Sequence, residues 1–216
     1  REIEKRDPFF RRGDYGRSFS IAGFFSKDVM EEIKPILSCG EDGHLRDLIL
    51  ELLVSSKEAS HLEADLRSIL LSKEASINSR LLASKCLFSI SSFDYKEDLS
   101  VLISEADHNS LRVASEIIRS VYITPYDHEV TLGFLRKCAK LYPEGYEDYN
   151  PQIESRYFVK RFISYLNHTI AERLLDDLTL GLECICDKQS YECGCRTGIS
   201  KIIGLLLDNY FSAALP

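Results

Sequence analysis

The sequence predicts an all-α fold, an α-solenoid of about five helical hairpins, and three observations carry this prediction. Residues 44–124 contain neither glycine nor proline, although the tight turns of β-hairpins depend on such residues. Apolar residues recur at spacings of three and four, and no segment alternates with a period of two for long enough to form a strand. An arginine also stands at the start of every second predicted helix.

Apolar stripes define ten short amphipathic helices. The clearest stripe joins five apolar residues between Leu45 and Leu53 at i, i+3, i+4, i+7 and i+8, which places them on one helix face. Residues 19–25 form either an eleventh short helix or a loop. The ten helices are predicted over residues 29–37, 45–53, 62–70, 81–90, 99–106, 111–121, 132–141, 153–166, 170–182 and 199–211.

Short polar clusters separate the stripes, at residues 55–58, 72–74, 94–97 and 107–110. Serine, aspartate and asparagine side chains accept hydrogen bonds from the free amides of a helix's first turn. We therefore predict that helices end and begin at these clusters.

The helix-start arginines indicate an internal repeat. They are Arg46, Arg80, Arg112, Arg156 and Arg196, which are 34, 32, 44 and 40 residues apart. Two helices in a period of this length are typical of helical-hairpin solenoids. A plain helical bundle, with arginines in these places by chance, is the alternative.

The repeat resembles the HEAT or armadillo-like class, in which the second helix of a hairpin often starts with a small residue followed by Arg, Ala or Leu. In that class proline often bends the first helix, and Pro35 fits such a bend. Residues 6–17, RDPFFRRGDYGR, precede the first hairpin. This segment resembles the stretch that follows the ATPase module of bacterial STAND NTPases with a NACHT-like core.

That resemblance implies a recognition or autoinhibition segment downstream of an ATPase. The chain has no Gly-x-x-x-x-Gly-Lys-Ser/Thr motif, so we assign no nucleotide hydrolysis to it. The start at Arg1 and the single methionine, Met30, lead us to expect a piece of a longer protein. We predict a leader over residues 1–26, with a possible short helix, and a HEAT-like solenoid over residues 27–216.

The charge is unevenly distributed along the chain. The formal net charge is −7, but residues 1–17 carry a net +2. The basic leader either contacts an acidic neighbouring domain or is a solvated terminus. An acidic body repels a phosphate backbone, so we expect protein partners or neighbouring domains and no nucleic acid.

Seven cysteines, an odd number, favour free thiols in a reducing compartment, and we expect a cytoplasmic protein. No apolar run approaches the ~20 residues of a membrane span, and residues 1–20 lack a signal-peptide pattern. Cys39, Cys86 and Cys138 are predicted core residues. The cluster of Cys184, Cys186, Cys193 and Cys195 leaves three alternatives: buried free thiols, a zinc site or a disulfide.

No residue is assigned a catalytic, cofactor-binding or metal-binding role. The chain has no His-x-x-x-His pair, and we expect His44, His61, His108, His128 and His168 to cap helices or face solvent. The carboxylate pairs Glu41-Asp42 and Asp176-Asp177 are expected on solvated faces. The tyrosine-rich and acidic segment 142–151 is either a functional insertion or a long connection.

The sequence thus predicts a non-enzymatic interaction or sensor segment of a bacterial STAND NTPase. A stand-alone scaffold or adaptor is the alternative. A HEAT-like DNA glycosylase is a third hypothesis, which the absence of tryptophan and the acidic body disfavour.

Overall fold

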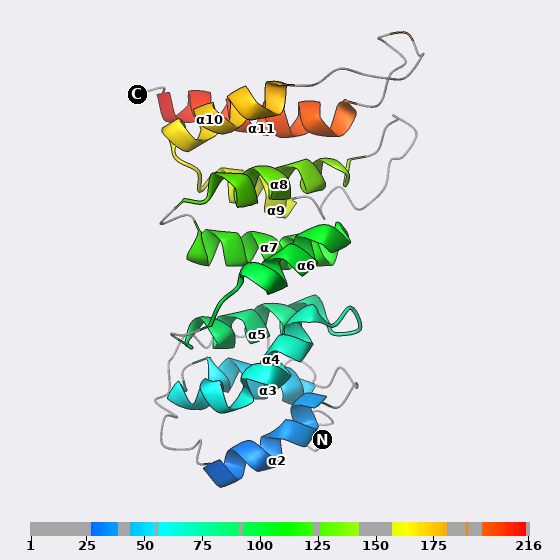
Figure 1. The fold of residues 1–216 in the computed structure, drawn as a ribbon, viewed down its shortest axis with the longest axis vertical. Helices are drawn as coiled ribbons and strands as arrows, with labels where there is room; N and C mark the ends of the chain where they lie inside the picture. Colours follow the sequence, from blue (N-terminus) through cyan, green and yellow to red (C-terminus); the bar gives the residue numbers. More distant parts are fainter. Residues whose placement is uncertain are drawn as a thin grey trace. The chain divides into compact units, whose positions relative to one another are not determined.

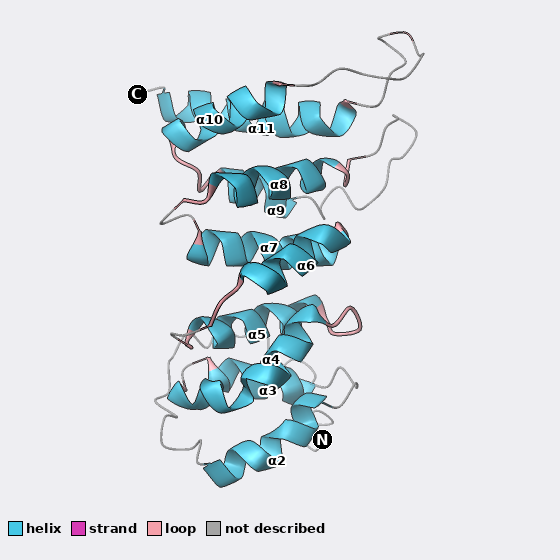
Figure 2. Cartoon of the chain, viewed as in Figure 1, coloured by secondary structure: helices cyan, strands magenta, loops and turns pink. Residues whose placement is uncertain are grey.

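The computed structural model describes residues 27–38, 44–54, 56–90, 93–122, 126–142, 157–180, 189 and 196–214 (Figure 1). Within these residues the chain forms helices joined by turns and loops, and it forms no strand (Figure 2). The prediction of an all-α protein is confirmed for this part of the chain.

The described residues form ten α-helices and one 3-10 helix, and each of the ten predicted helices is present. The helices are α2 (Lys27–Ser38), α3 (His44–Leu53), η1 (Lys57–Leu62), α4 (Glu63–Leu71), α5 (Ile77–Phe88), α6 (Lys96–Glu105), α7 (His108–Val121), α8 (His128–Ala139), α9 (Tyr157–Ile163), α10 (His168–Thr179) and α11 (Thr197–Ala214). The helix proposed near residues 19–25 lies outside the described residues, as does the whole leader 1–26.

Side-chain caps set several helix starts. The Asp107 carboxylate accepts hydrogen bonds from the backbone amides of Asn109 and Ser110 at 3.0 and 3.1 Å, at the start of α7. Ser56 likewise caps η1. Ser76 caps α5 by accepting from the Ser79 amide, so this helix begins four residues before its predicted start at Leu81. The 72–74 cluster therefore ends α4 but does not start α5.

Helix α9 is shorter than the predicted helix 153–166. It ends at Ile163, and residues 164–166 form a turn whose amides donate to the carbonyls of Lys160, Phe162 and Ile163. Residues 153–156 lie outside the described part.

The chain divides into two compact units, Arg1–Asp98 and Leu99–Pro216. In the first unit, α2 packs against α3 and α4, α3 packs against α5, and α4 pairs with α5. Its core is built from leucines that are fully enclosed, among them Leu50, Leu53, Leu62, Leu66, Leu70 and Leu87.

The helix-start arginines of the first unit are buried and hold neighbouring elements together. Arg80 donates from Nε to the Leu70 carbonyl at 2.9 Å, which ties α5 to the end of α4. Arg46 donates to the Ser79 hydroxyl at 3.2 Å, and Asp47 accepts from the Ser79 hydroxyl and from Asn78. The start of α3 is thereby fixed to the start of α5.

In the second unit the two helix-start arginines that the structure describes are not buried. Arg112 and Arg196 are exposed, and Arg156 lies outside the described residues. Among the helix-start arginines that the structure describes, Arg46 and Arg80 alone form buried links.

Alternate helices of the second unit pack against each other. α9 contacts both α7 and α11, α8 contacts α7, α10 and α11, and α10 pairs with α11 (Figure 1). The rings of Phe134 on α8 and Phe162 on α9 meet edge to face, with centroids 4.9 Å apart, in the middle of this core.

No helix among the described residues is both long enough and apolar enough to cross a membrane.

Two glycines of α11 provide a test of this packing. A Cβ added at Gly198 would lie 2.0 Å from the backbone oxygen of Ala139, at the end of α8, whereas a Cβ at Gly204 would meet nothing within 4 Å. We predict that Gly198→Ala lowers the free energy of unfolding by about 2 kcal/mol, because a backbone atom must move. Gly204→Ala is the matched control and is expected to raise it by about 0.5 to 1 kcal/mol through helix propensity. Urea unfolding measures both, and equal effects would contradict the α8–α11 contact.

Candidate functional site

The most chemically suggestive sequence features lie outside the described residues. They are Cys184, Cys186, Cys193 and Cys195, the carboxylate pair Glu41-Asp42, and residues 143–151 of the tyrosine-rich segment. Within the described residues no group of three or more His, Cys, Asp or Glu side chains is placed to hold a metal ion.

Cys86 and Cys138 are buried free thiols, as predicted. The Cys86 thiol donates to the Leu50 carbonyl at 3.3 Å, and burial raises its pKa to about 12. Burial likewise raises the pKa of Cys138 well above its usual value. Because the thiolate is the reactive form, neither cysteine is a nucleophile at neutral pH. Cys39 lies outside the described residues.

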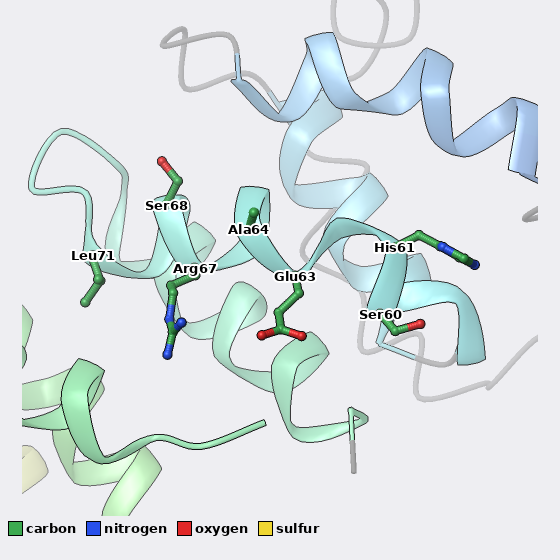
Figure 3. A pocket seen from close by; sticks show the side chains of 7 residues that line it. All are labelled: Ser60, His61, Glu63, Ala64, Arg67, Ser68 and Leu71. Carbon is green, nitrogen blue, oxygen red and sulfur yellow. The ribbon is translucent and has the colours of Figure 1, made fainter. Parts of the chain in front are cut away.

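A shallow depression of about 590 Å³ lies along η1 and α4. Its polar lining comprises Ser60, His61, Glu63, Arg67 and Ser68. Figure 3 shows that His61 points away from Arg67 and that Ser68 projects from the opposite side of α4. Catalytic groups must converge on one reacting atom, so this arrangement offers no catalytic site.

Arg67, the positively charged residue of this depression, already has partners within the protein. Arg67 donates from Nε to both carboxylate oxygens of Asp98 at 2.9 Å, and its guanidinium lies 5.0 Å from the centre of the Phe93 ring. Asp98 is only 3% exposed. Burial raises the pKa of Asp98, and Arg67 offsets part of that increase. Arg67 and Asp98 therefore form an internal ion pair of the first unit.

This pair predicts a pH effect on stability. Because the folded-state pKa of Asp98 lies above its unfolded value of about 3.9, the folded state binds the proton more tightly. The contribution of Asp98 to the free energy of unfolding therefore decreases as pH rises from about 4 through the folded pKa. We predict that the stability of the native chain relative to Asp98→Asn falls over this range, as measured by urea unfolding.

Glu97 is an exposed neighbour of Asp98. The variant Glu97→Gln therefore serves as the control, because it removes one negative charge just as Asp98→Asn does. A difference between native chain and Asp98→Asn that stays constant or increases with pH would refute the assignment.

A second polar cluster joins α8 to α10. His128 is 8% exposed, and its Nδ1 lies 3.1 Å from the Tyr126 hydroxyl. Its Nε2 lies 2.5 Å from the Asp177 carboxylate. Both ring nitrogens are thus occupied, so the imidazole cannot take a proton from a substrate without first breaking one of these bonds. The cluster links two helices.

This cluster corrects one expectation from the sequence. His128 neither caps a helix nor faces solvent but is buried against Asp177, because α10 packs against α8 and brings together residues 49 positions apart. The Asp177 side chain remains 37% exposed, as expected of a solvated face, and it also bonds to His128. Asp176 is exposed, as expected. Of the other histidines, His44, His61 and His168 are exposed and His108 is half-buried.

We predict that His128→Ala lowers the free energy of unfolding by about 2 kcal/mol, because it leaves Asp177 and Tyr126 without their shared partner. His61→Ala is the matched control. Its imidazole is exposed and forms a surface pair with Glu58, so a change within about 0.5 kcal/mol is expected. Equal losses in the two variants would show that the cluster contributes nothing.

The third candidate is a surface of the second unit, which we call the α7–α9 face. It consists of Arg112, Glu116 and Arg119 on α7, together with Tyr157, Lys160, Arg161 and Tyr165 on α9 and the turn that follows it. On each helix these residues recur at spacings of three and four, so they line the side opposite the buried one.

Contacts across the two helices make this face continuous. The Arg119 guanidinium lies 5.1 Å from the centre of the Tyr165 ring, and Arg161 donates to the Tyr165 hydroxyl at 3.3 Å. Arg119 also pairs with Glu116 at 2.6 Å. The hydroxyl of Tyr165 and the charge of Glu116 both raise the pKa of Arg161, so its positive charge is permanent. Tyr157 is 67% exposed and Tyr165 is 44% exposed.

Sequence reasoning did not identify this face. Its residues were visible as two stripes on the outer sides of predicted helices, Arg112 to Arg119 and Tyr157 to Tyr165. The missing information was that α7 and α9 lie side by side, although α8 separates them in the chain.

Comparison of the chain with protein-family models, with curated proteins and with solved structures finds no match.

Proposed function

We propose that the chain is a repeat of helical hairpins of the HEAT or armadillo-like kind, and that it binds protein partners. The packing of alternate helices supports the repeat. Within the first unit α2 contacts α4 and α3 contacts α5, and within the second α7 contacts α9, α9 contacts α11 and α8 contacts α10. Hairpin repeats stack in this manner, because each repeat can bury its apolar side only against its neighbours.

The α7–α9 face is the observation that carries the binding role. Tyrosine and arginine are the residue types most enriched where protein interfaces gain their affinity. Here two exposed tyrosines and three arginines share one surface, and Arg119 and Arg161 hold the Tyr165 ring in place. A ring that is already ordered loses less side-chain entropy on binding.

The parent protein that we propose is a bacterial STAND NTPase with a NACHT-like core, in which this chain would be an interaction or sensor region. Residues 6–17 carry that resemblance, and they lie outside the described part. A P-loop module directly upstream in the reading frame would support the proposal. Its absence there would favour a stand-alone adaptor.

A site-specific photo-crosslinker tests the binding role. We predict that benzoylphenylalanine in place of Tyr157, in the full chain expressed in cells, gives crosslinks to a defined protein segment. The same group in place of Glu172, an exposed residue of α10, should not give them. Mass spectrometry of the crosslinked peptides identifies the segment. Absence of crosslinks at both positions, or the same products from both, would count against a binding role for this face.

A further inference from the structure

We propose that the α7–α9 face binds an acidic polypeptide segment, whose carboxylates pair with the arginines and lysine while its apolar side chains lie on the tyrosine rings. This inference rests on the proposed protein-binding function, and it specifies the surface and the chemistry of the partner.

The positive charge of this face is local. Helices α7 and α9 carry four basic side chains and a single acidic one, Glu116, in a chain whose net charge is −7. Helix α10 carries three carboxylates and one arginine, and α8 carries one carboxylate and two basic residues. The α7–α9 face is therefore a basic surface in an acidic protein, and complementary charge favours an acidic partner.

Much of this charge is available to a partner. Arg112 and Lys160 are exposed, and neither forms an ion pair with any residue that the structure describes. Both Arg119 nitrogens that bond to Glu116 use the same oxygen, Oε2. One carboxylate therefore neutralises only part of the charge on this face, and the planar guanidinium groups suit the bidentate pairing that carboxylates offer.

The tyrosines supply the second element of recognition. Tyr157 begins α9, Arg161 lies four residues after it, and Tyr165 lies four residues further on, in the turn that follows the helix. The two tyrosines therefore stand on either side of Arg161 in the sequence, and Arg161 donates to the Tyr165 hydroxyl. Alternating charged and apolar contacts of this kind match a peptide that carries both carboxylates and apolar side chains.

The same features count against a nucleic acid. A protein binds a nucleic acid through several phosphate contacts along an extended basic surface. The basic surface here does not extend over α10, which packs against α8 and carries more carboxylates than basic residues. Four cations on two short helices suit the few carboxylates of a peptide segment better than the regularly spaced charges of a polynucleotide.

Fluorescence anisotropy on the full chain tests this proposal. The probe is a fluorescein-labelled peptide of alternating glutamate and alanine, and a glutamine–alanine peptide and polythymidylate of the same length serve as comparisons. We expect the glutamate peptide to bind, the glutamine peptide not to bind, and the affinity to fall as salt is raised.

The paired variants decide whether the binding occurs at this face. Arg112→Glu combined with Lys160→Glu should weaken binding about tenfold or more, a change of about 1.4 kcal/mol. These two side chains are exposed, so the fold should be retained, as circular dichroism can verify. Lys140→Glu combined with Arg173→Glu makes the same change of charge at exposed sites on other elements and should leave the affinity within about twofold.

Three outcomes would each overturn the proposal. They are an equal loss of affinity in the two double variants, no binding of the glutamate peptide at low salt, and tighter binding of polythymidylate than of the glutamate peptide. If crosslinks at position 157 persist in those cases, the face binds a protein segment of different chemistry. If the crosslinks are absent as well, the protein-binding function itself fails.

Discussion

The fold depends on packing between helices that lie two positions apart in the chain. Such contacts join α2 with α4 and α3 with α5 in the first unit, and α7 with α9, α8 with α10 and α9 with α11 in the second. The α-helices have between 7 and 18 residues, and helices of this length are marginal in water without tertiary packing. α9 is the clearest case, because its seven residues form no long apolar stripe of their own. It is held between α7 and α11, where Phe158, Val159, Phe162 and Ile163 are buried. The Asn209 side chain of α11 closes the turn that follows by donating to the Leu166 carbonyl at 3.0 Å.

The helices could be predicted from the sequence because this packing requires apolar residues at spacings of three and four. The stripe of Leu45 to Leu53 and that of Leu111 to Val121 give helices at the expected places. The boundaries were less predictable, since a cap such as Ser76 starts α5 before its apolar stripe begins. The 3-10 helix η1 was missed because only Ala59 and Leu62 within it are buried apolar residues, which is too few to define a period.

Contacts between distant residues explain what the sequence could not predict. His128 looks like a helix-start histidine in the sequence, and only the packing of α10 on α8 brings Asp177 to its ring. The repeated arginine was visible as a pattern, but its burial at Arg46 and Arg80 follows from how α3, α4 and α5 meet. The α7–α9 face is concealed in the same way, because an overall charge of −7 gives no sign of a basic surface made by two helices that α8 separates in the chain.

The arrangement of α7 to α11 can be measured most directly from nuclear Overhauser effects between aromatic rings of the full chain. Three ring pairs each join two different helices: His108 with Phe158 at 5.3 Å between centroids, Phe134 with Phe162 at 4.9 Å, and His168 with Tyr210 at 3.8 Å. The arrangement predicts cross-peaks for all three pairs, and the pair of His108 and Phe158 tests the contact between the alternate helices α7 and α9. Helices that are formed, as shown by sequential amide cross-peaks, but that lack these three inter-helix cross-peaks would contradict the arrangement on which the proposed binding face depends.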